Sequence, residues 1–310
     1  MKKRKIRIAF GCIFYPLMMG RYMLEALLRR PDVEVWSYGP FTGTWIPWGG
    51  GMQIDSRFIF TPDFPMTYES AAPTINYGLV EKAIPKQPDL WLEVNAGIHV
   101  HGRPKQSPYA VIGTDPHVLG GIYDQVRPAT DYFFGMQTPY LRPKDIWLPY
   151  GFDPIWHAPS KMPMADRPFD AALLGLAYAH RTQLMQHLQS MGMKVVYQLG
   201  LVYEQARDVY HKTKVGINWS SLQDTTARCY ELMAMGCVPV LNRVPDLMRM
   251  FTDGEHFLGF DGFEEARTHV LRMVNDPKEA EELARKAKRA VAEHTWDNRM
   301  ERVLLKTGVL

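Results

Sequence analysis

Cysteine is scarce in this chain: Cys12, Cys229 and Cys237 are the three among 310 residues. An odd count at these spacings fits neither a disulfide framework nor a zinc site. A hydrophobic content of 46% allows a substantial core without such cross-links. Cys229 and Cys237 are therefore expected to be small core residues, and the predicted location is the reducing cytoplasm.

Long apolar runs are also missing. No stretch reaches the ~18 uncharged residues that a membrane-spanning helix requires, so no integral membrane association is expected. The basic N-terminus and the apolar residues that follow it resemble the start of a signal peptide. Arg7 interrupts that run, however, and no small-residue cleavage site follows. We therefore interpret residues 6–10 as a buried first strand.

The chain has little excess charge of either sign. Its 36 Lys and Arg against 33 Asp and Glu give a net charge of +3, and five of the basic residues lie within the first seven. This is not the concentrated basic surface typical of a DNA-binding domain, although it does not exclude a DNA partner.

The apolar pattern alternates between strand-like and helix-like segments, which predicts an α/β protein with parallel sheets. The turn-rich segment Pro149–Pro159 is interpreted as a linker. It divides the chain into a domain of residues 1–150 and a domain of residues 151–294. Ligands of open α/β sheets bind beyond the carboxyl ends of the strands, so functional residues should directly follow strands. The predicted strands are residues 6–10, 33–36, 89–94, 109–113, 132–135, 146–148, 170–175, 194–198, 215–217 and 237–241.

The segment from Lys214 to Leu247 is the most informative one. A buried strand leads to Asn218 and a polar loop, then to a short helix with Arg228 and Glu231, and Gly236 ends the helix. An arginine and a helix N-terminus can bind a diphosphate, and a carboxylate can bind ribose hydroxyls. Two alternatives stay open: Arg228 and Glu231 form an ordinary intrahelical ion pair, and Asn218 is only a turn residue.

Gly175 and Arg181 follow the first strand of the second domain. A glycine there permits close approach of another group to the backbone, and Arg181 could reach a diphosphate. The chain has no G-x-G-x-x-G fingerprint, so this signal is weaker than that of a dinucleotide site. The alternative for Arg181 is a solvated helix start.

In the first domain, Asp115 and His117 follow the apolar strand 109–113. An Asp and a His in this position can act as general base and orienting partner. Asp115 could equally be a turn residue before Pro116. No third ligand is apparent beside them, so no metal is expected. Glu93 is a further candidate buried carboxylate, and the aromatic, glycine-rich loop with Trp45 and Trp48 is a candidate acceptor-binding wall.

The second half resembles the nucleotide-binding domain of GT-B glycosyltransferases, in particular the spore-maturation (CgeB-like) subgroup and its family-4-like relatives. The resemblance rests on an ordered series from Gly175 to Arg299: Gly175 and Arg181, Lys214–Asn218, the R-x-x-E-x-x-A-x-G run from Arg228 to Gly236, Pro245-Asp-Leu, and His294–Arg299. It implies two Rossmann-like domains facing a central cleft, with a C-terminal helix (residues 295–310) that crosses back onto the first domain.

The resemblance also implies roles for these residues. Glu231 would bind the ribose of a nucleotide-sugar donor, and Arg228 and Arg181 would lie near its diphosphate. Such enzymes usually need no metal or other cofactor. Many retaining relatives carry a second glutamate where this chain has Gln223, so the stereochemical outcome stays open.

We therefore expect a glycosyltransferase that moves a sugar from a nucleoside diphosphate to a hydroxyl acceptor. Asp115 and His117 are the catalytic candidates, and Gly175, Arg181, Asn218, Arg228 and Glu231 are the donor-binding candidates. The acceptor is open between a glycan, a metabolite, a protein and a phage-type hydroxymethylated DNA base. The cytoplasm is then that of a bacterium, or of the host if a phage encodes the chain. A non-catalytic sugar-nucleotide-binding protein and a sugar-nucleotide epimerase of the same fold are the alternatives.

Overall fold

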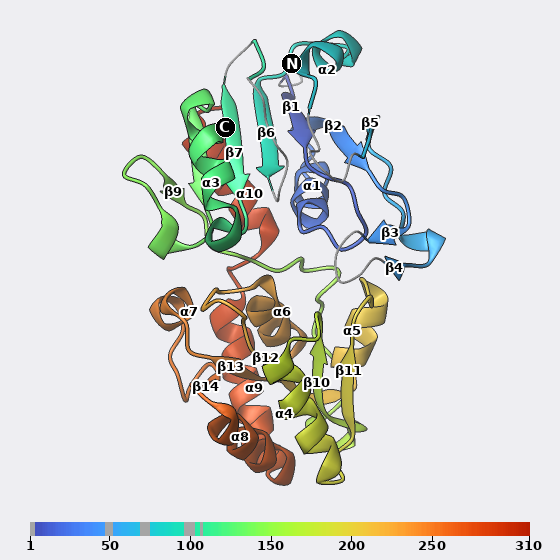
Figure 1. Cartoon of the computed structure of the whole chain (residues 1–310), viewed down its shortest axis with the longest axis vertical. Helices are drawn as coiled ribbons and strands as arrows, with labels where there is room; N and C mark the ends of the chain where they lie inside the picture. Colours follow the sequence, from blue (N-terminus) through green and yellow to red (C-terminus); the bar gives the residue numbers. More distant parts are fainter. Residues whose placement is uncertain (1–3, 47–51, 69–74, 96–102, 106–107) are drawn as a thin grey trace. The chain divides into compact units, whose positions relative to one another are not determined.

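The computed structural model describes residues 4–46, 52–68, 75–95, 103–105 and 108–310. The chain forms two compact units (Figure 1). Unit 1 combines residues Met1–Pro149 with Trp296–Leu310, and unit 2 is Tyr150–Thr295. Each unit is built around its own parallel sheet.

The sheet of unit 1 has seven strands in the order β5-β2-β1-β6-β7-β8-β9. The strands β2 and β5 are added to one side of β1, and β6, β7, β8 and β9 are then added to its other side. The strand order thus reverses between β1 and β6, and all pairings in this sheet are parallel. The bounds are β1 Ile6–Gly11, β2 Val33–Phe41, β5 Phe64–Thr67, β6 Leu90–Asn95, β7 Tyr109–Gly113, β8 Tyr132–Gly135 and β9 Ile146–Trp147.

The α-helices among the described residues of unit 1 are α1 (Gly20–Leu28), α2 (Tyr77–Ala83), α3 (Pro116–Val126) and α10 (Trp296–Lys306). The last of them comes from the far end of the chain, and in Figure 1 its red ribbon lies among the blue and green elements. It packs against α1. A two-bond ion pair joins Arg29 to Asp297, with N–O distances of 2.9 and 2.8 Å. A small antiparallel pair, β3 (Trp45–Ile46) and β4 (Met52–Gln53), and the 3₁₀ turns Ser56–Phe58, Arg127–Ala129 and Thr138–Tyr140 complete the unit.

Unit 2 has a five-stranded parallel sheet in the order β11-β10-β12-β13-β14. Here the order reverses between β10 and β12. The strands are β10 (Phe169–Leu174), β11 (Val195–Gln198), β12 (Thr213–Asn218), β13 (Val238–Asn242) and β14 (Leu258–Phe260). The helices are α4 (Ala179–Ser190), α5 (Glu204–His211), α6 (Ala227–Met235), α7 (Pro245–Met250), α8 (Phe263–Asn275) and α9 (Pro277–Val291), and Met164–Asp166 is a 3₁₀ turn.

The core of unit 2 shows why these segments fold as they do. Leu173, Val215 and Val240 on three neighbouring strands are completely buried in one cluster with residues of α4, α8 and α9, and the alternate residues Ala172 and Leu241 are completely buried as well. Strands buried on both faces require nearly continuous apolar runs, and the sequence supplies them. Gly236 ends α6 in the left-handed conformation, with φ of 74°, which glycine adopts without strain.

The strands predicted from the sequence are confirmed to within a few residues, with one notable extension. β2 continues to Phe41, five residues beyond the predicted end at residue 36, and β5, which was not predicted, pairs with this extension. Cys12, Cys229 and Cys237 are free and buried. None of the helices described is both long enough and apolar enough to cross a membrane.

Candidate functional site

In unit 2 the strand reversal between β10 and β12 brings two loops together at the carboxyl edge of the sheet. Open α/β sheets bind ligands at this point, because the loops from neighbouring strands diverge there and leave a crevice. Gly175 directly follows β10, and Asn218 is the last residue of β12. The topology therefore places two of the donor-binding candidates side by side.

Arg228 joins these two strand ends. It lies in the first turn of α6, and its Nη1 donates to Asn218 Oδ1 at 2.8 Å. A β-carbon added to Gly175 would lie 2.6 Å from Arg228 Nη2, and Gly175 has a φ of 153°. The missing side chain thus lets the guanidinium approach the main chain at the end of β10. Asn218 is buried and oriented by two contacts rather than being a simple turn residue, since its Oδ1 also accepts from Thr226 Oγ1 at 3.2 Å.

Arg181 is a buried residue, not a solvated helix start, because only 5% of it is exposed. Its Nε donates to the carbonyl of Trp219 at 2.6 Å and its Nη1 to that of Leu176 at 3.1 Å. Its guanidinium lies 4.6 Å from the ring centre of Tyr178. Arg181 therefore fixes the loop after β10 to the loop after β12.

The two arginines form a cationic centre. Burial, and then the nearby positive charge of Arg228, lower the pKa of Arg181 to about 10. In the part of the chain that the structure describes, neither arginine forms an ion pair with a carboxylate. The buried carboxylate of Asp224 is near enough to raise the pKa of Arg181 slightly but does not offset the lowering, so an anionic ligand would stabilise this arrangement further.

Glu231 lies one turn along α6 from Arg228, but the intrahelical ion pair is absent from the described contacts of either residue. Its Oε1 instead lies 3.6 Å from Nε2 of His157, which is buried. His157 Nδ1 accepts a hydrogen bond from the backbone N–H of Asp153 at 3.0 Å. In the neutral ring the proton is then on Nε2, which faces the carboxylate. The sequence prediction missed His157, because the segment Pro149–Pro159 was read only as a linker.

The N-termini of α4 and α6 open at the same edge of the sheet. Tyr178 and Thr226 occupy their N-cap positions, and neither side chain caps its helix. Uncapped N–H groups and the positive end of the helix dipole favour an anion. With the two arginines and Glu231, this edge offers groups for a diphosphate and for a hydroxylated sugar.

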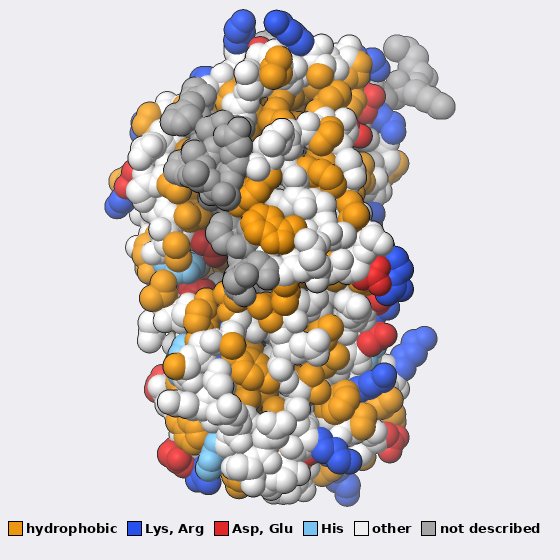
Figure 2. Space-filling model, turned by 45° about the vertical axis from the view of Figure 1, so that its right-hand side comes forward, with side chains coloured by type: hydrophobic (Ala, Val, Ile, Leu, Met, Phe, Trp, Pro, Cys, Tyr) orange, Lys and Arg blue, Asp and Glu red, His pale blue; other side chains and the backbone are white. Residues whose placement is uncertain are grey.

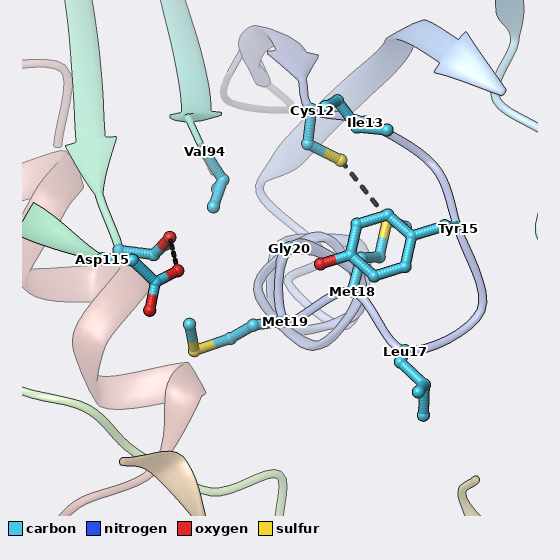
Figure 3. Close-up of a pocket in the computed structure, with 10 residues that line it drawn as sticks. Cys12, Ile13, Tyr15, Leu17, Met18, Met19, Gly20, Val94 and Asp115 are labelled. Atoms are coloured by element: carbon cyan, nitrogen blue, oxygen red, sulfur yellow. Dashed lines mark hydrogen bonds between the residues drawn. The ribbon is translucent and has the colours of Figure 1, made fainter. Parts of the chain in front are cut away.

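Unit 1 has a cavity at the corresponding place, where its strand order reverses between β1 and β6. Its volume is about 170 Å³. Figure 3 shows Val94 at the end of β6 and Asp115 just beyond the end of β7, with Cys12 on the opposite side. The start of α1 contributes Met18, Met19 and Gly20. One catalytic candidate, Asp115, thus lines a cavity, and Thr114 Oγ1 donates to its Oδ2 at 2.9 Å.

His117 has a different environment. It is not among the ten described residues that line the cavity. Its Nδ1 lies 3.1 Å from Gln137 Nε2, and its ring contacts Tyr140. Asp115 and His117 both belong to the loop and first turn that begin α3, but of the two, Asp115 alone is among the described residues that line the cavity.

Two further sequence features have separate outcomes. Gln223 lies in the loop before α6 and has a φ of 62°, which is unusual for a residue with a side chain. Such strain concentrates at ligand sites and turns.

Of the candidate acceptor wall, Trp48 and the glycines at 49–51 lie outside the described residues, and Trp45 packs edge-on against Tyr68.

The chain is similar to several known proteins. A family model described as "Glycosyl transferase-like" matches residues 161–305. A solved alpha-glucosyltransferase in complex with UDP and a 13-mer DNA containing an HMU base is similar, with a TM-score of 0.67 and 11% identity, over 99% of this chain and 100% of that chain.

Sucrose-phosphate synthase from Thermosynechococcus elongatus gives a TM-score of 0.63 at 12% identity, over 98% of this chain and 99% of that one. A putative UDP-N-acetylglucosamine 2-epimerase from Listeria monocytogenes gives a TM-score of 0.59 at 11% identity, over 98% of this chain and 96% of that one. No curated protein matches this chain significantly. Residues 161–305 are therefore similar to a glycosyl transferase-like family, and the similarity along the whole length shows that the chain has the two-domain GT-B fold.

Proposed function

We propose that unit 2 binds a nucleoside-diphosphate sugar and that the sugar is transferred to a hydroxyl group of an acceptor bound by unit 1. The observation that carries the proposal is the cationic centre at the β10–β12 reversal. Arg181 and Arg228 lie there without a described carboxylate partner, between two uncapped helix N-termini.

Each residue of this site has a task in the reaction. Arg228 and the N-terminus of α6 bind the diphosphate, and Asn218 holds the Arg228 guanidinium in place. Arg181 fixes both loops and adds positive charge. Glu231 accepts hydrogen bonds from the ribose hydroxyls. In this scheme protein groups balance the charge of the leaving diphosphate, without a metal ion.

During transfer the acceptor oxygen forms a bond to the anomeric carbon, and the bond from that carbon to the diphosphate oxygen breaks. The bonding electrons leave with the nucleoside diphosphate, and Asp115 takes the proton of the acceptor hydroxyl. His117 is not among the described residues that line the cavity, so this scheme gives it no part in the proton transfer.

A thermal-shift screen with UDP-, GDP-, ADP- and dTDP-sugars tests the donor site. The correct donor raises the melting temperature because it binds only the folded chain. UDP-glucose is the first donor to test, since the solved alpha-glucosyltransferases include a complex with UDP-glucose. Loss of a charge-assisted contact costs about 1.5–3 kcal/mol, so Arg228→Ala and Glu231→Ala should weaken donor binding roughly 10- to 100-fold.

Arg285→Ala and Glu282→Ala are the matched controls, because both side chains are exposed on α9 and pair with each other. They should leave donor affinity unchanged. Unaltered donor affinity in folded Arg228→Ala and Glu231→Ala variants would refute the assignment. Incubation with donor alone followed by product analysis separates a transferase from an epimerase, and activity that survives EDTA is expected if no metal takes part.

A further inference from the structure

The turn from Asp153 to His157 fixes the histidine through both its main chain and its ring. The His157 N–H donates to the Asp153 carbonyl at 2.9 Å, and the Asp153 N–H donates back to His157 Nδ1 at 3.0 Å. Asp153 Oδ1 accepts from the N–H groups of Ile155 and Trp156, at 2.9 and 3.1 Å. Asp153 is completely buried, and 7% of His157 is exposed. The local chain therefore holds the imidazole in one orientation.

These bonds also determine which ring nitrogen carries the proton. A backbone N–H can only donate, so Nδ1 acts as the acceptor, and the neutral ring has its proton on Nε2. Nε2 lies 3.6 Å from Glu231 Oε1, just beyond hydrogen-bond length. A small movement of either side chain completes an N–H···O bond, so the turn directs a donor at this carboxylate.

Glu231 is held on one side and open on the other. Its side chain is 19% exposed, and Oε2 forms no hydrogen bond with the residues that the structure describes. Arg228, one turn away on α6, is directed to Asn218 instead. A glutamate side chain loses rotamer freedom when it binds a ligand, and a contact that fixes it beforehand reduces that loss. His157 thus prepares the carboxylate for a ligand that meets Oε2.

The chemistry of that ligand follows from the carboxylate. An ionised carboxylate accepts hydrogen bonds and repels phosphate. Beside a site that binds a diphosphate, its favourable partners are the hydroxyls of a sugar, and the ribose of the nucleotide and the transferred sugar both carry them. A nucleoside diphosphate without a transferred sugar tests the ribose alone.

We propose that His157 is a positioning residue of the donor site. It holds the Glu231 carboxylate in the orientation that accepts the ribose hydroxyls, so the site selects a ribonucleoside diphosphate over one without these hydroxyls. This deepens the proposed function and rests on it, because the role of Glu231 belongs to that proposal.

The test measures the Kd of UDP, GDP and ADP, and of their 2′,3′-dideoxy forms, by calorimetry on the full-length chain. The wild-type chain should bind the ribonucleotide roughly tenfold or more tightly than its dideoxy form, because hydrogen bonds to a charged acceptor are lost. His157→Phe keeps a ring but has no N–H donor, and it should reduce this ratio to about threefold or less. In a Glu231→Ala chain, His157→Phe should change the affinity no further, because His157 acts through Glu231.

Two variants separate positioning from general damage. His157→Gln should keep most of the ratio, since its amide N–H can donate near the position of Nε2. His211→Phe is the matched control and should leave the ratio unchanged. His211 Nε2 donates to the Ala158 carbonyl at 2.7 Å, so this substitution disturbs the same segment at a contact other than that with Glu231.

Pyrophosphate controls for the diphosphate itself and should bind the wild-type chain and His157→Phe equally. On the face shown in Figure 2, the Lys and Arg side chains of the described residues lie among Asp and Glu rather than in one basic patch. This face therefore favours no competing site for a diphosphate.

A measurement without ligand tests the contact directly. In long-range ¹H–¹⁵N NMR spectra of the ligand-free chain, the His157 signals are assigned by their loss in His157→Phe. They should show the neutral ring with its proton on Nε2, and Glu231→Gln should shift Nε2 more than Nδ1.

Three results would overturn the proposal: a ring proton on Nδ1, a ratio that His157→Phe leaves unchanged, and an equal loss of affinity for the ribonucleotide and its dideoxy form. The last would mean that His157 only maintains the fold. If the wild-type chain binds none of the nucleoside diphosphates, the donor site of the proposed function fails, and this inference fails with it. If the wild-type chain prefers the ribonucleotide and His157→Phe keeps that preference, the donor site stands and this inference alone fails.

Discussion

At the scale of single residues, Glu93 on β6 is the most constrained titratable group of unit 1. It is completely buried. Its Oε1 accepts from the hydroxyls of Tyr38 at 3.0 Å and Tyr77 at 2.8 Å, and its Oε2 accepts from Tyr109 at 2.8 Å. Burial raises the pKa of Glu93, and the three hydroxyl donors oppose that shift without cancelling it. Burial and the nearby Glu93 charge in turn raise the pKa of all three tyrosines, so they remain neutral donors.

Glu93→Gln should alter how the stability of unit 1 depends on pH. A carboxyl whose folded-state pKa is raised stabilises the fold below its unfolded pKa, near 4.5, and that contribution is lost as pH rises through the folded pKa. Glutamine does not titrate. As pH rises through this window, the free energy of unfolding of the wild-type chain should fall relative to that of Glu93→Gln by up to about 1.4 kcal/mol per pH unit. Above the folded-state pKa the difference should become constant.

Urea unfolding of both chains from pH 4 to pH 8 measures this difference, since the other titrating groups cancel between them. Glu34→Gln serves as the control, because this residue lies on the same sheet but its side chain is 37% exposed. A wild-type-minus-variant difference that stays constant with pH would show that the pKa of Glu93 is not raised.

At the scale of elements, local signals in the sequence predicted best where they are strong. An Asp directly before a Pro is a strong signal for a helix start, and Asp276 Oδ1 accepts from the N–H groups of Lys278 and Glu279 at the start of α9. The helices α2, α3, α7 and α8 were not predicted, although α3 and α7 also begin with proline. Pro116 was interpreted as a turn signal, because the pair Asp115-Pro116 is equally typical of a turn and of a helix start.

The candidate site shows the same limit. Arg228 and Glu231 were found because they repeat at helical spacing next to a buried strand. Asn218 was also named as a donor-binding candidate, but its contact with Arg228 was not predicted, and His157 was missed, because both contacts form only through the tertiary fold. The cavity of unit 1 draws on β1, α1, β6 and β7, and no single segment of the sequence carries a signal for it.

Asp276→Ala should destabilise unit 2 by about 1 kcal/mol, because two N–H groups at the start of α9 lose their acceptor. Thermal or urea unfolding of the variant measures the loss. Glu282→Ala removes an exposed ion pair of the same helix and should cost no more than about 0.5 kcal/mol. Equal effects of the two changes would contradict a specific capping contribution from Asp276.

At the scale of the whole molecule, the chain closes unit 1 with its own C-terminal segment. Residues 296–310 belong to unit 1 although unit 2 separates them from the rest of it in sequence. The Arg29–Asp297 ion pair and the hydrogen bond from Arg299 Nε to the Pro149 carbonyl, at 2.8 Å, fix α10 in place. Unit 1 is therefore complete only when the entire chain up to α10 is present, which couples its folding to that of the full chain.

Met300→Ala tests this coupling. Met300 is completely buried on α10, and truncating a buried methionine costs about 2–5 kcal/mol. Since α10 packs against α1, amide hydrogen exchange followed by mass spectrometry should accelerate in α1, although the substitution lies beyond unit 2 in the sequence. Exchange in α8 of unit 2 should not change. Leu305→Ala, at a position of α10 that is 58% exposed, should leave both helices unchanged. Faster exchange in α8 with none in α1 would mean that α10 stabilises unit 2 instead, and that the chain does not close unit 1 with its C-terminal helix.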